Sequence, residues 1–203
     1  MKDLQLIESA RLLESFDDVA VVFHKKPDGD ALGSALALCL GLQQLNRRCK
    51  ILNFEPIPKR FEFLFKGLSF EEFDHKNVVA VDLASFRLLD DELNGIKINL
   101  LIDHHLNSDV DADFALIDCT AAATCELIYK LLKLLNVKFN KWIALCLYVG
   151  LVTDTGCFKF SNTTSLTHKI AADLFGYGVD FSSVNLELFD IKTMPQIELQ
   201  LEA

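Results

Sequence analysis

Short runs of apolar and β-branched residues alternate with longer segments of helical periodicity along this 203-residue chain. Such runs predict strands at residues 19–23, 49–54, 78–81, 98–102 and 114–117. Helical periodicity predicts helices at residues 32–45, 124–136, 141–152 and 165–175. Strands that alternate with helices form a mostly parallel sheet with helices on both faces, so we expect an α/β fold. In such folds ligands bind beyond the carboxyl ends of the strands.

The composition excludes several classes of protein. Hydrophobic residues make up 51% of the chain and charged residues 24%, which excludes intrinsic disorder. The formal net charge of −9 argues against duplex nucleic acid as a partner, because a duplex is bound by basic surfaces. No apolar stretch approaches the roughly 20 residues that span a bilayer, and no signal peptide opens the chain, so we expect no membrane partner. The six cysteines form no C-x-x-C pair, which favours reduced thiols and a cytoplasmic location.

The sequence pattern changes after Gly178. Residues 1–178 are predicted to form one domain, and residues 179–203 an amphipathic linker helix region. Because the chain stops within this helix-like segment, we expect the linker to lead to a further domain. The apolar face of the linker could also support a homodimer.

Four polar clusters carry the residues that can do chemistry, and three of them directly follow predicted strands. They contain His24, Asp28 and Asp30; Asp82; Asp103, His104 and His105; and Asp154. Taken alone, each cluster has an ordinary explanation, such as a helix cap, a strand end or a pair of hydrogen-bonded loop histidines. Asp154 is harder to explain in this way, because a carboxylate at the end of a helix opposes the helix dipole.

Taken together, the clusters supply six side chains of the types that bind metal ions: His24, Asp28, Asp30, Asp82, His104 and Asp154. Imidazole and carboxylate ligands in this mixture suit a borderline-hard divalent ion such as Mn²⁺. Two such ions bridged by one carboxylate would use all six side chains and would activate a water molecule for attack at phosphorus.

The four clusters, taken with their neighbours, resemble the four motifs of the DHH phosphoesterase family. The matching segments are HKKPDGDALGS at 24–34, VDLA at 81–84, IDHH at 102–105 and TDTGCFKFSNT at 153–163. They occur in the family's order and cover about residues 19–177. The resemblance is specific because all four motifs are present.

The resemblance implies a role for each matching residue. One Mn²⁺ would be held by His24, Asp28 and Asp82. The second would be held by Asp30, Asp82, His104 and Asp154, with Asp82 bridging the two; Mg²⁺ or Co²⁺ are alternative ions. His105 would contact the scissile phosphate, and Asp103 would orient the site. The substrate would be bound by Ser34, His105, Lys159 and Asn162, and the catalytic residues would be Asp82, Asp103 and His105.

The amino-acid sequence of the fourth motif is most similar to that found in the bacterial oligoribonuclease and pAp-phosphatase branch of the family. This similarity implies hydrolysis of short single-stranded RNA, linear dinucleotides such as pApA, and 3′-phosphoadenosine 5′-phosphate (pAp). The mechanism implied is attack by a metal-bridging hydroxide. Members of this branch carry a second, smaller DHH-associated domain that binds substrate, and no segment here matches its Gly-rich motif. We therefore expect this chain to be a catalytic half with weak activity.

Two other kinds of function stay open. The chain could be another hydrolase of the superfamily: a family II inorganic pyrophosphatase, a RecJ-type exonuclease or a cyclic-di-AMP phosphodiesterase. It could instead be a catalytically silent module that binds metal or nucleotide. The complete set of candidate ligands argues against the silent module, because a silent descendant would be expected to have lost at least one carboxylate.

Overall fold

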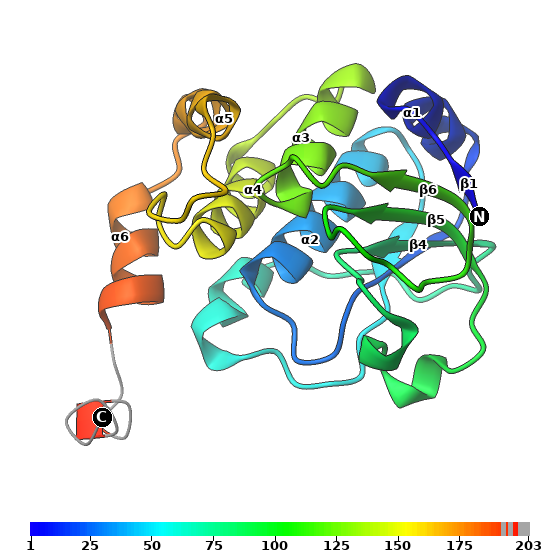
Figure 1. Ribbon diagram of the computed structural model, residues 1–203, viewed down its shortest axis with the longest axis horizontal. Coiled ribbons are helices and arrows are strands. Elements are labelled where there is room, and N and C mark those ends of the chain that lie inside the picture. The colour runs from blue at the N-terminus through cyan, green and yellow to red at the C-terminus, as the bar shows by residue number, and fades with distance from the viewer. Residues whose placement is uncertain (192–193, 195–196, 199–203) are drawn as a thin grey trace.

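The computed structural model describes residues 1–191, 194 and 197–198, and its centre is a parallel sheet (Figure 1). Within these residues the sheet has six strands in the order β1-β6-β5-β4-β2-β3, and every neighbouring pair is parallel. The strands are β1 (Lys2–Asp3), β2 (Val19–Val22), β3 (Cys49–Ile51), β4 (Asn77–Val81), β5 (Ile98–Asp103) and β6 (Ala112–Ile117). The predicted α/β fold with a mostly parallel sheet is therefore confirmed.

The short apolar runs form strands because both faces of the sheet are covered. All four residues of β2 are buried, and they alternate between two separate hydrophobic clusters. Val19 and Val21 belong to the larger cluster, whereas Ala20 and Val22 belong to the smaller one. Continuous apolar strands of this kind are typical of parallel sheets with both faces covered.

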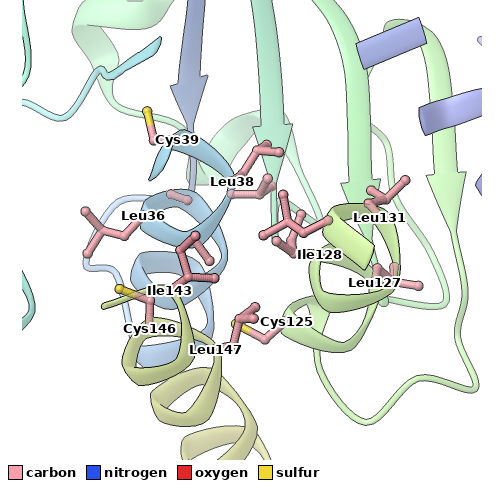
Figure 2. Packing of buried hydrophobic residues seen from close by; sticks show 14 of the residues in the cluster. Leu36, Leu38, Cys39, Cys125, Leu127, Ile128, Leu131, Ile143, Cys146 and Leu147 are labelled. Atoms are coloured by element: carbon pink, nitrogen blue, oxygen red, sulfur yellow. The ribbon is translucent and has the colours of Figure 1, made fainter. Parts of the chain in front are cut away.

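The α-helices contribute to the larger hydrophobic cluster, which lies on one face of the sheet. They are α1 (Leu6–Ser15), α2 (Gly29–Gln44), α3 (Thr124–Leu134), α4 (Lys141–Asp154), α5 (Ser165–Phe175) and α6 (Phe181–Asn185). Figure 2 shows buried side chains of α2, α3 and α4, among them Leu38, Ile128 and Leu147, gathered between the helices. Gly33 allows α2 and α4 to approach closely, since a Cβ atom there would collide with the carbonyl oxygen of Cys146.

The opposite face is covered by short 3₁₀ helices rather than α-helices. These are η2 (Phe86–Leu88) and η3 (Asp91–Leu93). Leu89 and Leu93 from this region are buried in the smaller cluster, together with Ala20 and Val22 of the sheet. Another 3₁₀ segment, η1 (Lys59–Phe65), contributes Phe61 and Leu64 to the larger cluster.

Two elements at the start of the chain were not predicted. β1 has only two residues, and it exists because Lys2 and Asp3 pair with Phe114 and Ala115 of β6. A strand of this length carries no periodicity of its own. Helix α1 follows it and buries Ala10 and Leu13 in the larger cluster.

The boundary at residue 178 and the linker at 179–203 stay predictions. The described part of that linker contains α6 and a single π-helical turn, η4 (Leu186–Asp190). The remainder, including Pro195, lies partly outside the described residues. In the portion of the chain that the structure describes, no helix combines the length and the apolar character needed to cross a bilayer.

Candidate metal centre

The four predicted clusters meet at the carboxyl edge of the sheet. His24 follows β2, Asp82 follows β4, and Asp103 ends β5. These three strands are adjacent in the sheet, so the loops that leave them start side by side. Asp154, the last residue of α4, contacts the same group of side chains.

One set of candidate ligands consists of His24, Asp28 and Asp82. The Nε2 atom of His24 lies 3.8 Å from Asp28 Oδ1 and 3.5 Å from Asp82 Oδ2. One ligand atom from each of the three side chains lies within 4.8 Å of the others, which is close enough to share an ion. Asp28 is also the N-cap of α2, where its Oδ1 accepts hydrogen bonds from the amides of Asp30 and Ala31. The cap is thus Asp28, and Asp30 lies inside the helix.

A second set consists of Asp30, His104 and Asp154. The Nε2 atom of His104 lies 3.2 Å from Asp154 Oδ2 and 3.9 Å from Asp30 Oδ2. It also lies 3.7 Å from Asp82 Oδ1. Asp82 therefore directs one carboxylate oxygen at each set, because its other oxygen faces His24.

The hydrogen bonds of the histidines fix which ring nitrogen faces the cluster. His24 Nδ1 lies 3.0 Å from the carbonyl oxygen of Lys25, and His104 Nδ1 lies 3.3 Å from that of Ala121. A carbonyl oxygen only accepts, so each Nδ1 carries a proton. In the neutral ring, each Nε2 then directs its lone pair at the carboxylates, as in histidines that bind metal ions.

The electrostatics of the cluster also fit a divalent cation. Burial raises the pKa of Asp30 well above its usual value, and the neighbouring carboxylates of Asp82 and Asp154 add to this effect. Burial lowers the pKa of His24, but Asp28 and Asp82 outweigh it and raise the pKa to about 11. Asp154, Asp30 and Asp82 likewise outweigh burial at His104 and raise its pKa to about 10. The buried carboxylates thus hold positive charge on the imidazoles, and metal ions would supply that charge instead.

Helix α3 holds two of the carboxylates in place, a feature that sequence reasoning missed. The backbone amides of Thr124 and Cys125 donate to the two oxygens of Asp30 at 2.6 and 2.9 Å. The hydroxyl of Thr124 donates to Asp82 Oδ1 at 3.1 Å. All three hydrogen bonds join residues far apart in sequence, so the threonine that begins a predicted helix was the only available signal.

Asp103 and His105 form a pair beside the cluster. Asp103 is fully buried, and its Oδ1 lies 2.7 Å from His105 Nδ1 and accepts from the amide of His104 at 2.8 Å. This hydrogen bond raises the pKa of His105. His105 lies at a cavity of about 140 Å³ whose other walls include His24, Asp82 and Asp154. The arrangement suits a positioned imidazole facing a bound anion.

The three predicted substrate-binding residues outside the cluster have different positions. Ser34 is fully buried, its hydroxyl donates to the carbonyl oxygen of Ala31, and it does not line the cavity beside His105. The side-chain amide of Asn162 donates to the carbonyl oxygens of Ala122 and Asp154, so it ties two loops together. Lys159 is exposed. None of the three lines the cavity beside His105, and their role in binding substrate stays a prediction.

Comparisons with known proteins identify a matching family and several relatives. A family model described as "DHH family, N-terminal domain" matches residues 18–151. The protein named bifunctional oligoribonuclease and PAP phosphatase NrnA from Thermus thermophilus is 33% identical over 172 residues, which are 82% of this chain and 52% of that protein. The protein of the same name from Bacillus subtilis is 31% identical over 195 residues, 91% of this chain and 61% of that protein. The chain thus spans between half and two thirds of these relatives.

A solved structure shares the fold. The exopolyphosphatase-related protein from Bacteroides fragilis superposes with a TM-score of 0.85 at 20% identity. The match covers 97% of this chain and 63% of that protein. At this level of identity the likeness shows a common fold.

Proposed function

This chain belongs to the DHH family, and on that premise we propose that it is a metal-dependent phosphoesterase that acts on very short RNA. The proposed substrates are short oligoribonucleotides, linear dinucleotides and pAp, in line with the names of the two relatives described above. The observation that carries the proposal is the position of Asp82, whose two oxygens face two separate sets of ligands. The proposed cofactor is a pair of divalent ions, with Mn²⁺ preferred.

Each candidate ligand has a defined place in this proposal. His24, Asp28 and Asp82 would hold one ion, and Asp30, Asp82, His104 and Asp154 would hold a second. When bound, the ions supply Lewis-acid stabilisation of the phosphoryl oxygens and lower the pKa of a water molecule.

The protein's own residues position the substrate and stabilise developing charge. We expect His105 to donate from its ring to a phosphoryl oxygen, because Asp103 holds the ring toward the cavity and raises its pKa. Asp103 acts through His105 and is a positioning residue. Asn162 keeps the loop after α4 against the loop before α3 and so supports Asp154. Lys159 is left as a candidate contact for substrate phosphates.

The wider setting supports a small substrate. A net charge of −9 disfavours long duplexes, whereas a short oligonucleotide needs only the local charge of the metal centre. The described cysteines are free thiols, which supports the proposed location in a reducing cytoplasm.

The direct test measures metal-dependent release of mononucleotide or phosphate from pApA, pAp and pyrophosphate. Mn²⁺, Mg²⁺ and Co²⁺ are compared, and the Asp82→Ala variant serves as the inactive control. We expect turnover of pApA and pAp with Mn²⁺ and none in the variant. Turnover of pyrophosphate alone would instead assign the centre to a pyrophosphatase, and metal binding with no turnover of any substrate would favour a silent module.

A further inference from the structure

A second cavity lies next to the candidate metal centre. Its volume is about 250 Å³, and Asp28 and Asp154 form part of its wall. Because these two carboxylates also line the cavity beside His105, the two cavities adjoin at the metal ligands. The rest of the second cavity is lined by Arg60 and Phe61 of η1, Thr153 of α4, and Leu188 and Phe189 of η4. The proposed function above uses none of the residues from η1 or η4.

Arg60 is the cation of this cavity. Its guanidinium carbon lies 4.7 Å from the centre of the Phe61 ring, and that ring is fully buried and therefore fixed. Among the described residues, no carboxylate lies within ion-pair distance of Arg60, whereas Arg47 and Arg48 pair with Asp17 and Asp18. A guanidinium group without a carboxylate partner can bind the planar edge of a phosphate with two hydrogen bonds.

Apolar side chains form the wall next to Arg60. Leu188 and Phe189 are half-buried, and both pack against the larger hydrophobic cluster. They belong to a π-helical turn, a distortion that is frequent at functional sites. An aromatic and aliphatic wall beside a cation offers a nucleoside a surface for its base and a counter-charge for its phosphate.

We propose that this cavity binds the nucleotide next to the scissile phosphate, and that Arg60 binds a terminal phosphate that is not hydrolysed. The base would lie against Leu188 and Phe189. The inference rests on the proposed function, because the metal centre defines which phosphate is cleaved. It adds a specificity rule: a dinucleotide with a terminal phosphate should bind better than one without.

The test combines changes in the protein with changes in the substrate. KM and kcat are measured with Mn²⁺ for pApA, for ApAp and for ApA, which lacks any terminal phosphate. The same values are measured for Arg60→Gln, and for Lys59→Gln as a matched control. Lys59 is the preceding residue, is exposed, and lines a different groove with Phe63 and Glu187. Because lysine and arginine each carry one positive charge, the two variants change the net charge by the same amount.

We expect Arg60→Gln to raise KM for one phosphorylated dinucleotide about 10- to 100-fold, as loss of a hydrogen bond between charged groups would do. KM for ApA should be nearly unchanged, and the dinucleotide that is affected identifies the end that carries the phosphate. Lys59→Gln should change none of the values. An equal rise in KM for all three substrates, or an unchanged KM for every one of them, would overturn the inference while leaving the proposed function intact.

If the wild-type chain cleaves neither the dinucleotides nor pAp, the proposed function fails, but the cavity can still be tested. The intact dinucleotides then serve as binding probes in calorimetry with Mn²⁺ present. A 10- to 100-fold weaker binding of one phosphorylated dinucleotide in Arg60→Gln, with ApA unchanged, supports the cavity's role. Identical dissociation constants in the wild type and this variant overturn it.

Discussion

The hydroxyl of Thr124 donates a hydrogen bond to Asp82 Oδ1 at 3.1 Å, although the two residues are 42 positions apart in the sequence. Asp82 is the carboxylate that faces both sets of candidate ligands, and it has a backbone φ of 51°, in the left-handed region. This backbone conformation is unfavourable for most residues, so it needs support from its surroundings. The first residue of α3 provides part of that support.

Replacing Thr124 should therefore weaken metal binding without removing a ligand. Thr124→Val keeps the shape of the side chain but loses the donor, and we expect the affinity for Mn²⁺ to fall about 10- to 100-fold, as for other changes that disturb the orientation of a ligand. Thr124→Ser restores the hydroxyl and should bind nearly as the wild type does. Isothermal titration calorimetry measures the Mn²⁺ affinity of both variants. Equal affinities in the valine variant and the wild type would show that Asp82 needs no help from α3.

The bridging position of Asp82 predicts that its replacement and the replacement of Asp28 remove different numbers of metal ions. Asp82→Ala should abolish binding of both ions, because its oxygens serve both sets of ligands. Asp28→Ala should weaken only the ion held with His24 and should leave the other set complete. The number of Mn²⁺ ions bound per chain, measured by elemental analysis after dialysis, distinguishes these cases. If both variants retain the full metal content, the ligand assignment is wrong.

The pairing of Asp103 with His105 predicts a loss of rate with the metal ions retained. Asp103→Asn weakens the acceptor for His105 Nδ1, so the ring should be less well held and less readily protonated. We expect kcat for pApA to fall about 10- to 100-fold. The Mn²⁺ content should stay at the wild-type value, and the pH at which the rate declines on the alkaline side should move lower. An unchanged pH profile would argue against action through His105.

The ion pairs of Asp18 predict that the free energy of unfolding varies with pH, without any part played by the metal centre. The ammonium group of Lys76 lowers the pKa of Asp18; burial has a smaller and opposite effect, and Arg48 adds to the lowering. Because the folded pKa lies below the usual value of 3.8, this stabilisation is complete above that pH. It is lost as the pH falls through the folded pKa.

The Asp18→Asn variant tests the direction of this change in stability with pH. Asparagine tolerates the backbone φ of 54° at this position, so the change removes the charge without adding strain. Urea unfolding should show a less stable variant at pH 7, and the difference from the wild type should shrink toward pH 3. Asp17→Asn, in an exposed pair with Arg47, should have little effect at either pH. A difference that does not depend on pH would contradict the prediction.

Local sequence patterns were sufficient to predict most of the elements. Strand β2 was predicted because Val19 and its neighbours form a short β-branched run, and α5 was predicted with the bounds that the structure shows. The position of the candidate ligands was also predictable, since His24, Asp82 and His104 each follow a strand of a parallel sheet. These features are local, because periodicity, turn residues and strand ends can each be recognised within a short window.

Tertiary structure alone decided the relations between distant segments. Strand β1 depends on its pairing with β6, the burial of Ser34 depends on the packing of α2, and the support of Asp30 depends on amides more than 90 positions away. Arg60 and Phe189 share a cavity only because η1 and η4 both lie beside the metal centre. The physical reason is that a hydrophobic pattern specifies which residues are buried but not which partner buries them. The residues that could bind metal were therefore determined by the sequence, and their partners by the packing of the whole chain.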